Sequence, residues 1–312
     1  MRSPLVSVVI PTYNQQALLR ETLQSVFAQT FTDYEVVVVN DGSTDGTSEY
    51  LRSLGKRIRL VEQGNQGIGA ARNRGIDEAT GKYVALLDHD DLWKPGKLEA
   101  QVLFMESHPE CTACSVPWAR STASTRCVFD SDAIRSNDGL VERPLWRLSQ
   151  GHQFLISSSI MFERQRAGGL RYGTRRQCIE DDPFQIGLFS RGPFGIAGND
   201  ILMIYRWHGG NSSAHAIHFY NGVRLLRTMQ RAGNFSLDPI QAHDLERFLS
   251  FLGRTAVVRQ LLGGYRGRAL DLYVREFLRQ TVDARFRFLL AFPVLALLPS
   301  GILHGRWKGD VK

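Results

Sequence analysis

The sequence is poor in cysteine, with four such residues among 312. Cys111 and Cys114 form a C-x-x-C pair, but Cys127 and Cys178 lie far apart and provide no second pair at matching spacing. The sequence therefore gives little support to a zinc site or a redox pair. We expect buried or idle thiols in a reducing compartment.

Long apolar runs are also missing, since a membrane-spanning helix needs about 20 apolar residues. The run Val6 to Ile10 is short and is ended by Pro11, so it is typical of a first strand and not of a secretory signal. We therefore expect the chain to stay in the cytosol. The run Phe288 to Leu303 is interrupted by two prolines and a glycine.

Two common phosphate-binding loops are absent. The glycine-rich stretch 64–69 lacks G-x-G-x-x-G spacing, because Arg72 stands where the last glycine is needed. No P-loop lysine is present either. These absences argue against a dinucleotide-binding protein. They also disfavour a nucleotidyltransferase, which usually carries a phosphate loop with glycine and lysine near its first strand.

The net charge is +7, and the pI is about 9.4. Acidic residues are well represented in the first half of the chain, whereas arginine dominates the second half. This asymmetry argues against a uniformly basic nucleic-acid-binding face, and no other feature supports nucleic-acid binding. A basic C-terminal part suits anionic lipids or phosphate-bearing partners.

Strand, loop and helix alternate four times in the first ninety residues, which predicts an α/β fold with a parallel sheet. The expected strands are 6–10, 35–39, 58–61 and 83–87, with helices around 19–27, 47–54 and 70–79. Asn14 is a candidate N-cap of the first helix. A fourth helix, with Pro95 in its first turn, is expected to end near Ser107.

The chain beyond residue 108 is less regular. We expect strands at 112–116, 157–162, 194–197 and 201–205, and a loop-rich region over 119–143. From about His215 the pattern predicts three amphipathic helices, at 216–232, 238–263 and 267–290.

The stretch Asp88 to Asp91 carries three carboxylates directly after an apolar strand. Open α/β sheets bind ligands at the carboxyl ends of their strands, and other polar residues, including Tyr13 and Asp41, follow neighbouring strands. Close carboxylates repel one another, and a divalent cation bound to substrate phosphates relieves the repulsion. The alternative is a solvated acidic turn in which Asp91 or a neighbour caps the next helix.

A second acidic cluster, Glu180 to Asp182, precedes Pro183. Proline favours the first helical position, which makes Asp182 the expected N-cap and leaves Asp181 and Glu180 freer to face outward.

Basic residues flank the interrupted apolar run near the C-terminus, namely Arg285, Arg287, Arg306 and Lys308. This pattern is typical of a segment that lies in a membrane interface. The alternative is an arm that packs on its own domain or on a partner chain.

Four runs in order resemble the motifs of family 2 glycosyltransferases of the GT-A fold. They are Ser7–Asn14, Val39–Asp45, Gly69–Gly75 and Leu87–Asp91, and a looser match continues through Ile179–Asp181 and Tyr205–His208. The resemblance implies a Rossmann-like, mostly parallel sheet flanked by helices in a catalytic domain over residues 1–214. Residues 215–312 then form a helical region, with a tail at 286–308 that we expect to be interfacial.

The resemblance also implies a donor site. Positions matching Pro11, Tyr13 and Asp41 line the nucleobase pocket in the family, and the position matching Arg72 lies near the base and the diphosphate. Within the D-x-D signature, Asp88 is expected to bind the donor ribose and Asp90 to hold Mn²⁺ or Mg²⁺. His89 occupies a variable position and is not expected to be a ligand.

The position matching Asp181 holds the general base in the family, with Asp182 or Glu180 as alternatives, because the sequence after Asp181 departs from the usual aromatic-acid-Leu-Trp pattern. His208 matches a histidine that completes the metal site in some members. The glycines and serines that follow it suit a segment that closes over the donor.

The function implied is inverting transfer of a sugar, hexosyltransferase-type, from a nucleoside-diphosphate sugar to an acceptor hydroxyl. A UDP-sugar is the favoured donor, and the acceptor is expected to be a cell-surface polysaccharide or lipid-linked glycan at the cytosolic face of the membrane. A nucleotidyltransferase, or a catalytically silent nucleotide-sugar-binding or scaffold protein, remains the alternative. Acceptor choice is expected to lie in residues 117–153 and in the helical tail.

Overall fold

The computed structural model describes residues 3–121, 126–128, 135–175, 179–208, 215–282, 290, 292–293 and 296. These residues form two compact units. The first contains the described residues up to Pro144 together with 152–175 and 180–208. The second contains residues 145–151, Ile179 and the described residues from His215 onward.

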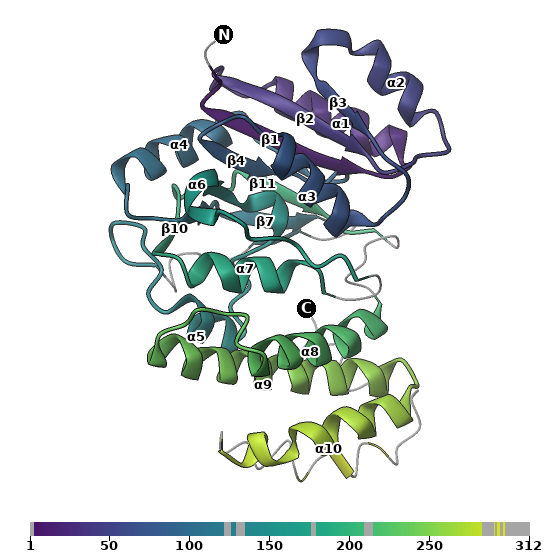
Figure 1. The fold of residues 1–312 in the computed structure, drawn as a ribbon, viewed down its shortest axis with the longest axis vertical. Coiled ribbons are helices and arrows are strands. Elements are labelled where there is room, and N and C mark those ends of the chain that lie inside the picture. Colours follow the sequence, from purple (N-terminus) through teal and green to yellow (C-terminus); the bar gives the residue numbers. More distant parts are fainter. Residues whose placement is uncertain are drawn as a thin grey trace. The chain divides into compact units, whose positions relative to one another are not determined.

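Seven strands of the first unit form one sheet (Figure 1), in the order β10, β6, β9, β4, β1, β2 and β3. They are β1 (Val6–Thr12), β2 (Tyr34–Asn40), β3 (Arg59–Glu62), β4 (Tyr83–Leu86), β6 (Ala113–Ser115), β9 (Met161–Glu163) and β10 (Phe194–Ile196). All neighbours are parallel except the two pairs made by β9. The predicted α/β fold with a mostly parallel sheet is therefore confirmed.

The central strands form where the sequence is rich in valine and other apolar residues. Every residue of β1 and β4 is buried. Because helices cover both faces of a parallel sheet, such strands read as continuous apolar runs without polar alternation. The first four predicted strands agree with β1 to β4.

Helices connect these strands within the first unit. They are α1 (Gln16–Phe27), α2 (Thr47–Ser53), α3 (Ile68–Glu78), α4 (Lys97–Ser107), α6 (Arg164–Ala167) and α7 (Asp181–Phe189), with the 3₁₀ turns η1 (Gly55–Arg57) and η2 (Ser157–Ser159). Helix α3 packs closely on the sheet because Gly75 faces it. A Cβ at Gly75 would lie 2.3 Å from Val9 Cγ1, so a larger residue would push the helix away.

A smaller sheet has the order β5, β11, β7 and β8. Its strands are β5 (Leu92–Trp93), β11 (Met203–Arg206), β7 (Trp118–Ser121) and β8 (Arg126–Val128). The prediction of a loop-rich region over 119–143 is wrong for the part that forms β7 and β8. These strands are short and lack an apolar period, so pairing in the folded chain, and not local pattern, defines them.

Two further local predictions are wrong. Residues 157–162 were expected to form one strand, but the structure has the turn η2 followed by β9. Asn14 does not cap α1. Gln15 occupies the N-cap position in a left-handed conformation, and Asn14 Oδ1 instead accepts a hydrogen bond from the amide of Thr44 at 2.8 Å.

The described helices of the second unit are α5 (Pro144–Ser149, in this unit from Leu145), α8 (Ala216–Arg231), α9 (Pro239–Leu262) and α10 (Arg266–Val282). Buried Arg227 of α8 contacts Glu276 of α10 at 2.7 Å and Glu246 of α9 at 2.7 Å. One guanidinium thus ties the three long helices together. The predicted helices 216–232 and 238–263 agree with α8 and α9.

The predicted interfacial tail, 286–308, lies outside the described residues except at 290, 292–293 and 296. The same is true of the glycine- and serine-rich segment 209–214. Within the described part of the chain, no helix is both long and apolar enough to span a membrane.

Candidate active site

The acidic loop, residues 88–91, directly follows β4 at the carboxyl edge of the large sheet. Asp91 is 1% exposed and accepts a hydrogen bond from Ser158 Oγ at 2.5 Å. Burial raises the pKa of Asp91 well above its usual value, and neighbouring Asp90 and Asp88 raise it further. Asp91 does not cap the next helix, because α4 begins at Lys97 with Gly96 at its N-cap.

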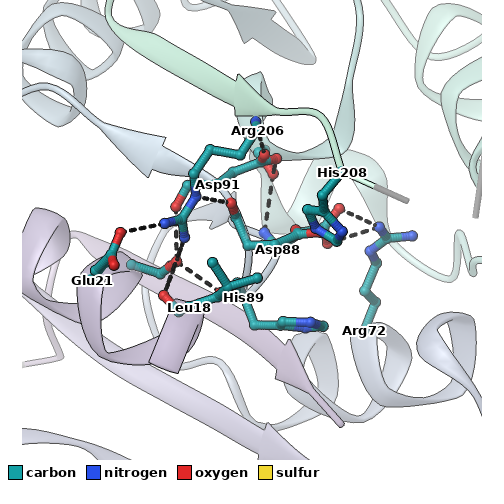
Figure 2. A network of polar contacts seen from close by, with 11 residues as sticks. Leu18, Glu21, Arg72, Asp88, His89, Asp91, Arg206 and His208 are labelled. Atoms are coloured by element: carbon teal, nitrogen blue, oxygen red, sulfur yellow. Dashed lines mark hydrogen bonds and ion pairs between the residues drawn. The ribbon is translucent and has the colours of Figure 1, made fainter. Parts of the chain in front are cut away.

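Arg206 joins this loop to helix α1 (Figure 2). Its amide donates to Asp91 Oδ1 at 3.1 Å, and its Nε donates to the carbonyl oxygen of Asp90. Its Nη1 contacts Glu21 at 2.5 Å, and its Nη2 donates to the carbonyl oxygen of Leu18 at 3.1 Å. Both the backbone and the side chain of Arg206 therefore fix the position of the acidic loop.

No role was predicted for Arg206 from the sequence, although it lies in the run Tyr205–His208. The available signal was its position in that run, two residues before the candidate ligand His208.

The structure brings His208 to Asp90, as the sequence analysis expected of a shared site. His208 Nε2 lies 3.0 Å from Asp90 Oδ2, and the two side chains are 29% and 14% exposed. A carboxylate oxygen and an imidazole nitrogen suit Mn²⁺ better than Mg²⁺, which prefers oxygen alone. The residues present therefore fit a divalent metal.

The described residues contain no group of three or more histidine, cysteine, aspartate or glutamate side chains that could hold a metal ion. Asp90 and His208 thus form a pair and not a complete protein cage. Such open coordination is typical of Mg²⁺ and Mn²⁺ sites that a phosphate-bearing substrate completes.

Arg72 connects the acidic loop to the second acidic cluster. Its Nη2 lies 2.8 Å from both carboxylate oxygens of Asp88, and its Nη1 lies 2.5 Å from Asp181 Oδ1. The Arg72 side chain is 3% exposed and lies over the ring of Tyr172, 4.9 Å from the ring centroid. Burial by itself lowers the pKa of Arg72, but Asp181 and Asp88 raise it above its usual value, so the guanidinium stays charged.

The start of α3 docks the segment before α7 onto the site. A Cβ at Gly69 would lie 1.9 Å from the carbonyl oxygen of Gly173, so only glycine allows this approach. Asn73 donates to the carbonyl oxygen of Tyr172 at 3.1 Å and accepts from its amide at 2.8 Å. These contacts place the backbone that leads toward Asp181.

Helix α7 begins at Asp181, and Glu180 is its N-cap residue without a side-chain capping bond. The prediction that Asp182 caps this helix is therefore wrong. Pro183 is the third helical residue and not the first, which moves Asp182 inside the helix, where its shielded Oδ2 has no hydrogen-bond partner.

The three acids of this cluster differ in their surroundings. Burial raises the pKa of Asp182 to about 7, and Asp181 and Glu180 add to the rise. Burial also raises the pKa of Glu180 to about 7. Burial raises the pKa of Asp181 as well, but Arg72 opposes the rise, and the side chain stays 32% exposed. Asp181 is therefore the member of the cluster that makes a direct ion pair with Arg72.

The residues predicted to surround a nucleobase lie at the ends of β1 and β2. Tyr13 is 42% exposed, whereas Pro11 and Asp41 are buried. Asp41 Oδ1 accepts from the amide of Gln66 at 2.9 Å, and Asp41 Oδ2 accepts from the amide of Gly67 at 2.8 Å. Asp41 thus orders the glycine-rich loop before α3, a role that the sequence analysis missed.

Cys111 and Cys114 are buried free thiols. Burial raises the pKa of Cys111 to about 12 and raises that of Cys114 as well. A thiol that stays protonated is a poor nucleophile and a poor metal ligand. This arrangement fits the expectation of idle thiols. The Cys127 side chain and Cys178 lie outside the description.

The family model for glycosyl transferase family 2 matches residues 7–166. A putative teichuronic acid biosynthesis glycosyltransferase, TuaG of Bacillus subtilis, is 44% identical over 210 residues, which cover 65% of this chain and 79% of TuaG. An uncharacterized glycosyltransferase of Escherichia coli, YibD, is 37% identical over 146 residues, or 45% of this chain and 42% of YibD. The chain thus matches less than half of YibD but most of TuaG.

Two solved structures share the fold. S. aureus TarS 1-349 in complex with UDP-GlcNAc gives a TM-score of 0.66 at 20% identity over 88% of this chain and 92% of TarS 1-349. The mannosyltransferase PcManGT from Pyrobaculum calidifontis, in complex with GDP-Man and Mn²⁺, gives a TM-score of 0.60 at 18% identity over 99% of this chain and 89% of PcManGT. At these identities the likeness shows the fold, and it confirms the GT-A type predicted from the sequence.

Replacing Asp182 with Asn is expected to stabilise the protein at high pH. The folded pKa of about 7 exceeds the usual value of 3.8, so the contribution of Asp182 to stability is present below about pH 4 and is lost as the pH rises through 7. The full shift corresponds to about 4 kcal/mol. Because the side chain keeps some solvent contact, we expect a gain of about 1–2 kcal/mol at pH 8 and less at pH 5.

Urea denaturation at pH 5 and pH 8 measures this difference. Asp200→Asn is the matched control, since Asp200 is exposed and its substitution should change stability little at either pH. Equal destabilisation of the Asp182→Asn variant at both pH values would show that the carboxylate is needed as a hydrogen-bonding group.

Proposed function

The chain belongs to glycosyl transferase family 2, and from this membership we propose that it transfers a sugar from a nucleoside-diphosphate sugar to an acceptor hydroxyl with inversion at the anomeric carbon. The observation that carries the proposal is the pair of acidic clusters that Arg72 joins. One cluster follows β4 and suits a donor and a cation, and the other lies at the start of α7 and suits a base.

A UDP-sugar is the donor we propose. Exposed Tyr13 offers an aromatic face for stacking. Asp41, whose amide donates to the carbonyl oxygen of neighbouring Thr12, is the carboxylate that we assign to the imide N–H of a uracil edge, in addition to its bonds with the glycine-rich loop. The ribose is assigned to Asp88, and the charge of Arg72 suits the adjacent diphosphate. The structure of TarS with UDP-GlcNAc supports a uridine donor, whereas that of PcManGT with GDP-Man makes guanosine the alternative.

Asp90 and His208 are the residues that we propose to hold a divalent cation, Mn²⁺ or Mg²⁺. A cation bound there would neutralise negative charge on the departing nucleoside diphosphate. The Mn²⁺ in the PcManGT complex supports this choice. The pairing of His208 with Asp90 also links the cation site to β11, the strand that Arg206 fixes against the acidic loop.

Asp181 is the proposed general base. The acceptor hydroxyl attacks the anomeric carbon from the side opposite the leaving diphosphate, and its proton passes to the Asp181 carboxylate. A single displacement of this kind inverts the configuration. The ion pair of Asp181 with Arg72, which also holds Asp88 of the donor cluster, supports its assignment over Glu180 and over Asp182, whose Oδ2 is shielded.

The two alternative functions have less support. A silent nucleotide-sugar-binding or scaffold protein has no need for an intact base beside an intact D-x-D run, and both are present here. A nucleotidyltransferase is disfavoured by the lack of a lysine-bearing phosphate loop near β1.

For the biological setting, we propose synthesis of a cell-surface polysaccharide or a lipid-linked glycan at the inner face of the cell membrane. The similarity to TuaG, a putative teichuronic acid biosynthesis glycosyltransferase, supports a polysaccharide product. Helix α10 supports membrane contact, because Leu270 and Val274 are 53% and 63% exposed and lie one helical turn apart. The sequence of the apolar run near the C-terminus, with basic residues on both sides, is also typical of a membrane-interface segment.

Asp90→Ala is expected to weaken nucleotide binding that depends on Mn²⁺. Thermal-shift measurements with a panel of UDP- and GDP-sugars, with and without Mn²⁺, identify the donor, because a ligand that binds only the folded state raises the melting temperature. A tenfold loss of affinity removes about 1.4 kcal/mol of this stabilisation. Asp200→Ala is the control, and a full metal-dependent shift in Asp90→Ala would contradict the cation assignment.

Asp181→Asn is expected to abolish transfer while donor binding stays within about twofold of the wild type. Loss of a general base lowers the rate by about 10²- to 10⁴-fold. Transfer assays with the donor identified above, alongside Asp182→Asn and Glu180→Gln, measure the effect. Unchanged transfer in Asp181→Asn, together with loss in one neighbour, would move the base to that neighbour.

Deleting residues 286–312 is expected to release the protein from vesicles that contain anionic lipid, without loss of donor binding. Each basic residue near such a surface contributes about 1 kcal/mol, so binding should also weaken in high salt. Because Phe292 stacks on Tyr273 at 4.0 Å, a second chain that ends at Pro293 retains this contact. Vesicle sedimentation measures both variants, and full association of both would contradict the interfacial tail.

A further inference from the structure

We propose that Arg72 is a positioning residue that makes Asp181 available as a base only when a donor occupies the site. This inference rests on the proposed function. In the structure, Arg72 holds Asp88 of the donor cluster and Asp181 of the base cluster at once, with contacts of 2.8 and 2.5 Å. A single cation is therefore shared between the two halves of the site.

The hydrogen bonds of Arg72 are incomplete in this arrangement. Its Nε is buried and has no hydrogen-bond partner, although all five N–H groups of a guanidinium can donate. Leaving a buried donor without an acceptor costs free energy. Another acceptor group, such as a phosphate oxygen, would satisfy this donor if the guanidinium turned toward it.

A nucleoside diphosphate changes the competition for Arg72. It brings at least two negative charges to the acidic loop, and phosphate oxygens accept the forked N–H groups of arginine as well as carboxylates do. Its ribose also engages Asp88, the partner that now takes both bonds of Nη2. Arg72 then turns toward the donor and leaves Asp181.

The backbone around Arg72 can stay fixed during this change. Gly69 lies against the carbonyl of Gly173, and Asn73 makes two hydrogen bonds with the backbone of Tyr172. These contacts hold α3 to the segment that leads to α7. Only the Arg72 side chain needs to move, and such a rotamer change requires no domain motion.

Release from Arg72 makes Asp181 more basic. The guanidinium lowers the pKa of Asp181 against the effect of burial, so its departure raises that pKa, and the charge of the diphosphate raises it further. Apart from Arg72, Asp88 raises the pKa of Asp181 and the Ser157 hydroxyl lowers it. The other titratable groups that interact with Asp181 are Tyr172, Glu180 and Asp182. Asp181 paired with Arg72 is therefore a weak base, and Asp181 released from Arg72 is a stronger one.

The inference predicts that nucleotide binding takes up a proton at Asp181. When the pH lies between the pKa of Asp181 in the free protein and its pKa in the nucleotide-bound protein, about half a proton is taken up per nucleotide bound. Isothermal titration calorimetry of the full chain with UDP and Mn²⁺ near pH 6, in two buffers of different ionisation enthalpy, measures this number. GDP with Mn²⁺ is the second probe.

Asp181→Asn is expected to bind UDP with similar affinity but to lose this part of the proton uptake. Protons exchanged at groups outside the second acidic cluster, including the cation ligands, are common to both proteins and cancel in the difference. Asp182→Asn and Glu180→Gln, measured alongside, report the two neighbours whose pKa Asp181 raises. Arg72→Met is expected to show a smaller uptake, because Asp181 is already released in the free state. Arg72→Lys, which keeps the charge but lacks the planar fork that contacts both carboxylates here, provides the same test if the methionine variant does not fold.

The outcomes separate this inference from the function on which it rests. Nucleotide binding with equal proton uptake in the wild type and Asp181→Asn would overturn the role of Arg72 and leave the glycosyltransferase proposal intact. Uptake in Arg72→Met and Arg72→Lys equal to that of the wild type would do the same. Absence of binding by both UDP and GDP in the presence of Mn²⁺ would overturn both proposals.

Discussion

Repulsion among carboxylates at one sheet edge is the constraint on which this structure depends, and two arginines from distant elements offset it. Arg206 comes from β11 and fixes the acidic loop through the backbone of Asp90 and the side chain of Asp91, whereas Arg72 comes from α3 and contacts Asp88. Figure 2 shows the two arginines on opposite sides of Asp88. Arg206 also contacts helix α1, and Arg72 also contacts Asp181 of helix α7. The same contacts that offset the charge of the loop therefore hold the parts of the site together.

The sequence predicted the central fold well because its signal is local. The apolar runs of β1, β2 and β4 are continuous, as buried parallel strands require, and a change to helical period follows each of the first two. The prediction failed at β7, β8 and β9. These strands have three or four residues each. Distant partners define β7, which pairs with β11, and β9, which pairs with β4 and β6, whereas β8 pairs with the neighbouring β7 and is too short to show an alternating pattern.

The site was predictable in its chemistry but not in its contacts. The family motifs and the polar residues at the strand ends were enough to place Asp88, Asp90 and His208 in one site. The link between Arg72 and Asp181 joins residues 109 positions apart and depends on how α3 and α7 meet. The misassigned cap at Asp182 has a similar cause, since a proline at the third helical position is locally as acceptable as one at the first.

Packing of the Lys97 side chain against Trp93 supports the acidic loop through Ser158. Lys97 is fully buried, its Nζ has no hydrogen-bond partner and lies 3.6 Å from the centroid of the Trp93 ring, and burial lowers its pKa well below the usual value. Burial thus favours the uncharged form of the amine, and the Lys97 side chain packs against the indole. Trp93 Nε1 in turn donates to the carbonyl oxygen of Ser158 at 2.8 Å, and the Ser158 hydroxyl donates to Asp91. A charged group in the position of Lys97 would have to be hydrated, which would loosen Trp93 and, through Ser158, the carboxylate that orders the loop.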